Sequence, residues 1–164
     1  MPNWCDLELR VLDGGCEELR EFISGKDSMG RQADVTFHKL IPMPDNIFRG
    51  DLGEEERKLY GKYNWYDWSI EHWGTKWDAC HVQYTPECVM FSTAWCPPFP
   101  WLEKLAERAA INGRTIKVNT WSEGMCKEDA FKGYLLQDGA LSEDEVDDDF
   151  ISGYDDLYNY EEED

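Results

Sequence analysis

Three histidines and six cysteines are the side chains whose chemistry could form a metal or nucleophilic site: His38, His72, His81, Cys5, Cys16, Cys80, Cys88, Cys96 and Cys126. Such sites usually take two ligands from a C-x-x-C or H-x-x-x-H pair, and the sequence has neither. Cys80, Cys88 and Cys96 recur every eight residues, which places two of them on facing strands of a predicted hairpin. Small buried hydrophobes are the better interpretation, so we expect reduced thiols, no metal and no cofactor.

The acidic residues Asp147, Asp148 and Asp149 are possible calcium ligands. An EF-hand loop needs alternating oxygen ligands and a glycine at its sixth position. A loop that starts at Asp147 has Ser152 at that position, and one that starts at Asp148 has Phe150 at a ligand position. The sequence therefore predicts no dedicated calcium site.

Motifs for covalent or phosphoryl chemistry are missing from the sequence. It contains no G-x-S-x-G, no Walker loop and no G-x-G-x-x-G. Paired carboxylates carry no information, because 35 acidic residues make such pairs unavoidable. We therefore expect no catalytic residues and a protein that is not an enzyme.

Aromatic side chains could form a second kind of site. Four tryptophans cluster in sequence at positions 65, 68, 73 and 77, and Trp95 and Trp101 flank a proline-rich turn. Stacking on single-stranded RNA needs basic residues beside the rings, and only Lys62 and Lys76 are near. Packing of these tryptophans onto a sheet and a partner-binding surface both remain open.

Charge is distributed very unevenly along the chain. The formal net charge is -19, from 35 acidic and 16 basic residues, and no Lys or Arg follows Lys132. Thirteen of the acidic residues lie between Gly133 and Asp164. This charge repels nucleic acid and anionic membranes and attracts basic surfaces. No apolar run is long enough to span a membrane, and the first residues do not resemble a signal peptide, so we expect a cytoplasmic protein.

Hydrophobic periodicity predicts the elements that must position these residues. The pattern indicates strands at 4–12 and 35–41, helices at 16–23 and 54–63, a short apolar element at 65–73, a hairpin at 80–93, a helix from 100, and strands at 115–121 and 131–136. Mixed in this order, they predict an α+β fold with a ferredoxin-like antiparallel sheet and helices on one face. We expect that domain at 1–137, with a Trp-rich insertion at about 45–78, and an acidic C-terminal segment at 138–164.

The acidic segment has its own structural signals. Ser142 and Glu145 have the spacing of a capping box, which predicts a helix starting at Ser142. Apolar side chains then follow at helical steps: Val146, Phe150, Tyr154 and Leu157. Ser152-Gly153 weakens the middle of this segment, so one kinked helix or two short ones would fit. Two interpretations remain open: a disordered solubilising tail, or an array of carboxylates held in place by apolar anchors. These anchors are Phe150, Ile151, Tyr154, Leu157, Tyr158 and Tyr160.

Four stretches, in order, resemble one known family. They are Met1-Pro2-Asn3-Trp4-Cys5, the segment 37–44 (FHKLIPMP), the segment 73–78 (WGTKWD) and the segment 91–101 (FSTAWCPPFPW). Together they resemble the YubB-type (Api-like) family of phage and plasmid proteins over roughly residues 1–135. The resemblance implies a mobile-element origin and a ferredoxin-like domain of unknown function, and it brings no catalytic residues.

These observations lead to one main functional hypothesis. We expect a phage or plasmid inhibitor that binds the basic surface of a host nucleic-acid-processing protein, such as a CRISPR or restriction complex, by mimicking nucleic acid. Direct binding of nucleic acid or membranes is not expected. The predicted partner-binding residues are Glu143, Asp144, Glu145, Asp147, Asp148, Asp149, Phe150, Tyr154, Asp155 and Asp156. The alternative is a non-enzymatic interaction module that uses the Trp-rich insertion, with a tail that only solubilises.

Overall fold

The computed structural model of the chain describes residues 2–158. It is an α+β structure built on one antiparallel sheet of six strands in the order β4-β5-β1-β6-β7-β8. These strands are β1 (Trp4–Val11), β4 (Cys80–Tyr84), β5 (Val89–Ala94), β6 (Ile116–Ser122), β7 (Phe131–Gln137) and β8 (Ala140–Asp144). A separate two-stranded ribbon pairs β2 (Gly25–Lys26) with β3 (Gln32–Ala33). The predicted α+β class is confirmed.

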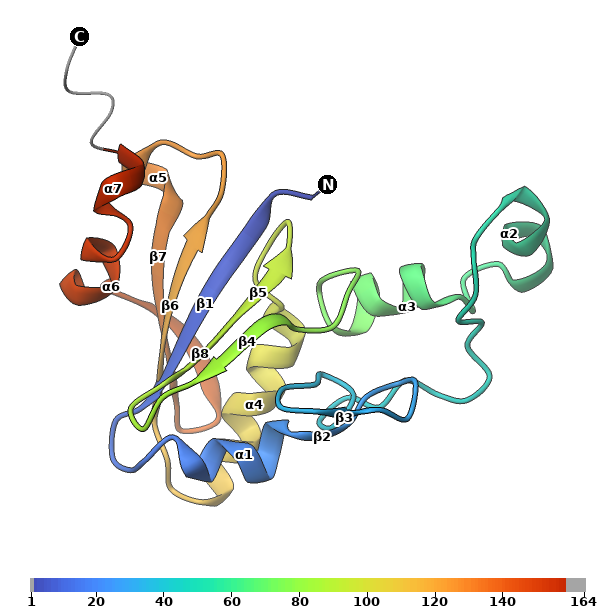
Figure 1. Cartoon of the computed structure of the whole chain (residues 1–164). Coiled ribbons are helices and arrows are strands. Elements are labelled where there is room, and N and C mark those ends of the chain that lie inside the picture. The colour runs from blue at the N-terminus through green and yellow to red at the C-terminus, as the bar shows by residue number, and fades with distance from the viewer. Residues whose placement is uncertain (1, 159–164) are drawn as a thin grey trace, which may run out of the picture.

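Seven helices complete the described part of the chain. They are α1 (Glu17–Ile23), α2 (Glu54–Tyr60), α3 (Trp65–His72), α4 (Phe99–Ile111), α5 (Lys127–Ala130), α6 (Asp148–Ser152) and α7 (Asp155–Tyr158). Helices α2 and α3 extend away from the sheet on one side of the molecule (Figure 1). The strands and helices predicted from the sequence have counterparts here, except the strand at 35–41 and the helix start at Ser142.

The core lies between the sheet and helices α1 and α4. Strand β1 alternates because Cys5, Leu7 and Leu9 point into this core and are fully buried, as period-2 patterning requires. Helix α4 presents Leu102 and Leu105, also fully buried, to the same layer. The apolar positions read from the sequence thus mark the face of the sheet that α1 and α4 cover, which we call the α1/α4 face.

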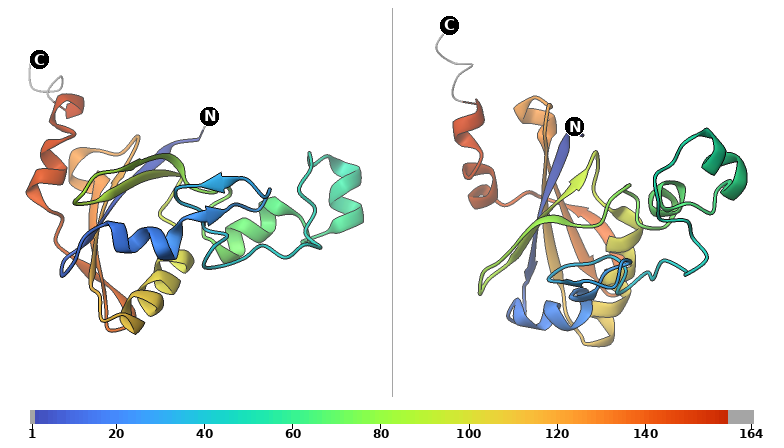
Figure 2. Two further views of the ribbon diagram at one scale, coloured as in Figure 1. Left: turned by 60° about the horizontal axis from the view of Figure 1, so that its bottom comes forward. Right: turned by 45° about the vertical axis from the view of Figure 1, so that its right-hand side comes forward.

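The opposite face of the sheet is covered by the C-terminal segment. In the views of Figure 1 and Figure 2, α6 and α7 lie on the other side of the sheet from α1 and α4. The prediction of helices on one face therefore holds for α1 and α4 only. We call the second side the α6/α7 face.

The segment 35–41 is a turn and not the predicted strand. Ile41 N donates to the Phe37 carbonyl at 3.0 Å, which curls the chain. The Asp78 carboxylate fixes this turn, because it accepts from the Thr36 hydroxyl at 2.6 Å and from the Phe37 amide at 2.8 Å. Val35 and Phe37 are still buried, so their apolar character reports burial and not extended backbone.

Candidate functional site

Polar side chains occupy the centre of the α6/α7 face. They come from the even positions of β1 and the odd positions of β6, where Glu8 pairs with Asn119 and Arg10 with Lys117. Glu8 and Lys117 are 6% and 5% exposed, which is unusual for charged residues and requires partners. Glu8 accepts a hydrogen bond from Arg10 Nε at 2.7 Å. The sheet thus carries a buried polar layer beneath the C-terminal segment.

Two buried polar side chains of β6 fasten that segment to the sheet. Asn119 Nδ2 donates to Asp147 Oδ2 at 2.9 Å, and the Asp147 amide donates to Asn119 Oδ1 at 3.0 Å. Lys117 Nζ lies 2.7 Å from Asp144 Oδ2 and also donates to the Glu145 carbonyl. The hydrogen bond from Lys117 lowers the pKa of the Asp144 carboxyl. Because Lys117 and Asn119 are buried, these contacts define where residues 144–147 lie.

Aromatic packing holds the two short helices. Tyr154 stacks on Trp121, with ring centroids 4.7 Å apart, and its hydroxyl donates to Asp6 Oδ2 at 2.8 Å. Phe150 is 6% exposed and packs against Phe131. Burial, and then the hydrogen bond to Asp6, raise the pKa of Tyr154 far above its ordinary value. The predicted anchors Phe150 and Tyr154 therefore pack on the domain itself.

Gly133 on β7 permits the chain to cross the sheet. A Cβ at this position would lie 2.5 Å from the Glu145 carbonyl oxygen and 2.7 Å from that of Asp144. Any other residue would thus push the backbone of 144–145 away from β7. The sequence does not reveal this role, because a glycine within an apolar strand indicates that another backbone comes close but not which one.

The structure places the predicted partner-binding residues in two groups. One group is used internally: Asp144, Asp147, Phe150 and Tyr154 make the contacts above, and Asp155 lies 3.8 Å from Lys127 Nζ. The other group is exposed and has no basic partner within 4 Å among residues 2–158: Glu143, Glu145, Asp148, Asp149 and Asp156. We call Glu143, Glu145, Asp148 and Asp149 the acidic array.

Two details predicted for the acidic segment are wrong. Ser142 does not cap a helix, because residues 140–144 form β8 and pair with β7. Leu157 is 57% exposed and does not continue the apolar stripe. The helix breaks at Gly153 and restarts at Asp155, which shifts the register. Tyr158, another predicted anchor, takes the inward position, and its hydroxyl accepts from Trp121 Nε1 at 2.8 Å. The predicted anchor Tyr160 lies outside the described residues.

A cavity of about 320 Å³ opens beside the acidic array, lined by Glu8, Arg10, Asp147, Asp148, Asp149 and Phe150. Only Arg10 contributes positive charge, and it is paired with Glu8. The cavity therefore offers carboxylates, and basic groups are the ligands that such a surface favours.

No cluster of three or more His, Cys, Asp or Glu side chains in residues 2–158 is arranged to hold a metal ion. All six cysteines are free; Cys5, Cys16 and Cys88 are buried, whereas Cys80 and Cys96 are half-buried and Cys126 is exposed. The interpretation of the cysteines as small buried hydrophobes therefore fits Cys5, Cys16 and Cys88 best. Burial raises the pKa of the Cys5 thiol to about 12 and that of Cys16 to about 11, so these thiols are poor nucleophiles. Within the same range, no helix is long and apolar enough to cross a membrane.

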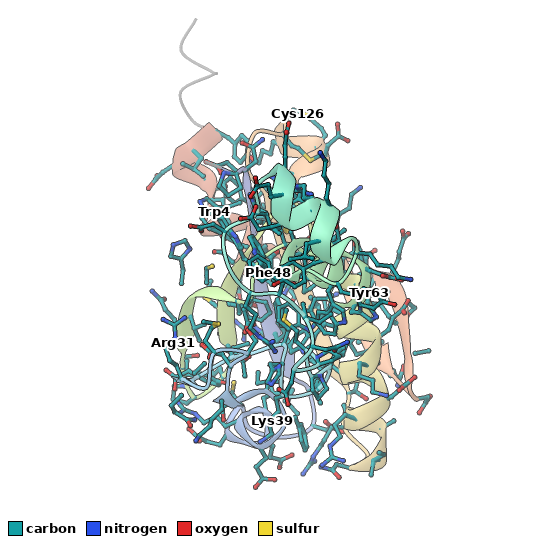
Figure 3. The ribbon with its side chains drawn as sticks, turned by 90° about the vertical axis from the view of Figure 1, so that its right-hand side faces the viewer. Trp4, Arg31, Lys39, Phe48, Tyr63 and Cys126 are labelled. Carbon is teal, nitrogen blue, oxygen red and sulfur yellow. The ribbon has the colours of Figure 1, made fainter. Side chains whose placement is uncertain are left out.

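The tryptophans divide between core and surface. Trp68, Trp73 and Trp101 are buried, whereas Trp77 and Trp95 are 37% and 46% exposed. The Lys76 ammonium lies 4.2 Å from the ring centroid of Trp77 and 4.3 Å from that of Trp95. The expectation of packing thus holds for the three buried tryptophans, whereas a partner-binding surface at the two exposed ones stays a prediction. Figure 3 views the molecule from the side on which α2 and α3 project. It labels Trp4 and, on the loops that flank α2, Phe48 and Tyr63.

Comparisons with known proteins do not extend these findings: no protein-family model, curated protein or solved structure matches the chain.

Proposed function

We propose that the chain is a phage or plasmid inhibitor that occupies the nucleic-acid-binding surface of a host defence protein. A CRISPR complex and a restriction enzyme are the partner classes that fit. The observation that carries the proposal is the fastening of an acidic segment to the sheet through Lys117, Asn119 and Trp121, which leaves the acidic array exposed. Ordered carboxylates lose less conformational entropy on binding than a flexible acidic tail does.

The spacing of the array supports mimicry of a phosphate backbone. Glu143 and Glu145 are two residues apart on and just after β8, a separation of about 6–7 Å along an extended chain. Asp148 and Asp149 follow in the first turn of α6. Four uncompensated carboxylates along one segment attract a groove lined with Lys and Arg and speed its encounter with the protein.

The proposal also includes the finer description of the fold and the setting. The order β1-α1-β4-β5-α4-β6, with β4-β5-β1-β6 as neighbours in the sheet, supports a ferredoxin-like core to which β7 and β8 are added. That core and the four sequence stretches support a relationship to the YubB-type proteins. We further propose that the protein acts in the bacterial cytoplasm and has no enzymatic activity.

Capture from a bacterial lysate tests the function. The array variant Glu143→Gln/Glu145→Gln/Asp148→Asn/Asp149→Asn removes four charges that make no ion pair. The matched control Glu21→Gln/Glu54→Gln/Glu55→Gln/Glu103→Gln removes four other exposed charges. We expect a nucleic-acid-binding complex to be retained by wild type and control, and to be lost with the array variant. Equal loss with both variants would mean that net charge alone governs binding, and retention of the complex by the array variant would contradict the proposed contact.

A second candidate function uses the aromatic side of the molecule. The exposed rings of Trp77 and Trp95 favour an interaction module in which the tryptophan-rich region around 65–77 docks a protein partner and the acidic segment adds solubility. Salt distinguishes the two functions, because screening weakens contacts between exposed charges but not aromatic docking. Retention that persists at about 1 M salt would favour the aromatic module.

A further inference from the structure

A second cavity lies on the aromatic side, away from the acidic array. It measures about 180 Å³, and the residues on which the argument depends are Arg49, Trp65, Trp73, Lys76, Trp77 and Asp78. It is smaller than the roughly 300–1,000 Å³ typical of pockets for drug-sized ligands. The cavity is therefore large enough for one flat heteroaromatic ring system, and the rest of a larger ligand would lie at its open side.

The cations of this cavity are not neutralised by carboxylates. Neither Arg49 nor Lys76 has an acidic oxygen within 4 Å among residues 2–158. Arg49 is held by backbone carbonyls of 43–47, and its Nε is buried without a hydrogen-bond partner. Lys76 packs between two indoles. Aromatic faces position an ammonium group without using up its donors, so Lys76 can still receive an anion. The terminal nitrogens of Arg49 already donate to four backbone carbonyls, so Arg49 adds only its positive charge.

The one carboxylate of the cavity is already engaged. Asp78 accepts hydrogen bonds from the Thr36 hydroxyl and from the amides of Phe37 and Ala79, at 2.6–2.8 Å. Its charge therefore organises the turn at 36–37 and leaves the two cations to dominate the ligand side. The cavity combines indole surface with two positive groups, which are the two features that nucleotide recognition by stacking requires.

Backbone strain occurs near the cavity, at two residues that do not line it. Trp95 has φ +74° and His81 has φ +54°, a region that residues other than glycine seldom adopt. Trp95 is held there by its amide, which donates to the Asn3 carbonyl at 2.8 Å, and its indole lies beside Lys76. His81 packs edge-on against Trp4, with centroids 4.9 Å apart. Strain retained in exposed aromatic positions is typical of ligand-binding surfaces.

We propose that this cavity binds a nucleotide, with the base against the indoles of Trp65 and Trp77 and the phosphate at the Lys76 ammonium, beside the positive charge of Arg49. A free mononucleotide and an unstacked nucleotide of a single strand share this chemistry. The free mononucleotide is the favoured source, because the net charge of -19 repels the further phosphates of a strand. This site is independent of the acidic array.

Binding of AMP and UMP, followed by NMR or calorimetry, and of a short fluorescein-labelled oligo(dT), followed by anisotropy, tests the proposal. We expect the mononucleotides to bind, and Lys76→Ala and Trp77→Ala each to weaken binding at least about fivefold, the lower limit for loss of one stacking contact. Lys104→Ala, a lysine on α4, should change nothing. Trp77→Phe keeps a ring and should restore part of the loss, which separates stacking from misfolding.

Each outcome assigns or rejects the site. Mononucleotide binding identifies a free nucleotide as the ligand, and binding of the oligonucleotide alone, sensitive to Lys76→Ala, would assign the same site to a strand. The proposal is overturned if neither probe binds at about 1 mM, the weak end of measurable affinity, or if Lys76→Ala and Lys104→Ala behave alike.

Discussion

Replacing Gly133 by alanine tests whether the acidic array is held in place by the crossing of the chain over β7. The new Cβ would lie 2.5 Å and 2.7 Å from the carbonyl oxygens of Glu145 and Asp144. Both contacts are with backbone, so the segment 144–145 must move by several tenths of an ångström. Overpacking of this kind destabilises by about 1–3 kcal/mol. For a chain of this length, that corresponds to a fall in Tm of about 2–12 °C.

Gly133→Ala should be compared with Gly15→Ala, because a Cβ at Gly15 meets nothing within 4 Å. Thermal unfolding gives the stability, and hydrogen exchange of the amides at 147–158 reports opening of α6 and α7. The variant keeps every carboxylate, so we expect partner binding to fall with no change in net charge. Equal stability and equal exchange for the two alanine variants would refute the role assigned to the crossing.

Three further predictions concern the same face and the core. Tyr154→Phe removes the hydroxyl that donates to Asp6 and should lower the free energy of unfolding by about 1–2 kcal/mol. The control Tyr63→Phe changes a ring that is 52% exposed and should be neutral. Equal stability of the two variants in urea unfolding would contradict the role of Tyr154 as an anchor. Asp144→Asn should destabilise the protein more than Glu143→Gln, because Lys117 loses its charge partner. This difference in stability should vanish as pH falls through the lowered pKa of Asp144. A difference that persists in acid would argue against the ion pair of Lys117 and Asp144. The pKa of Cys5 rises on folding from 9.0 to about 12, so the unfolded chain releases this proton first, and stability should fall between those values by about 1.4 kcal/mol per pH unit. Cys5→Ala should flatten that slope, and an unchanged slope would assign the loss to other groups.

Much of the sheet and its core could be predicted from alternation and helical spacing. The periodicity of Cys5, Leu7 and Leu9 and of the apolar face of α4 reports burial directly. The prediction of a strand at 35–41 is wrong, because Val35 and Phe37 are buried in a turn. That turn depends on Asp78, more than thirty residues away in sequence, and local patterns do not contain such contacts.

The candidate site could be predicted only in part. Phe150 and Tyr154 were identified as anchors from their spacing, but their partners Trp121 and Asp6 belong to strands β6 and β1. Ser142 and Glu145 matched a capping box, yet pairing of β8 with β7 took precedence. Lys117 and Asn119 had no sequence signal, because polar residues at the odd positions of β6 look like an ordinary solvent-facing set.

Competition with nucleic acid tests the central claim most directly. With a captured host complex immobilised, its cognate DNA is titrated against bound wild-type protein, the array variant and the matched control. Nucleic-acid mimicry predicts that DNA displaces wild type and control completely, and that the array variant binds at least about tenfold more weakly, a loss of about 1.4 kcal/mol. A ternary complex in which DNA and the protein bind together, or equal affinity of the array variant and the control, would contradict it.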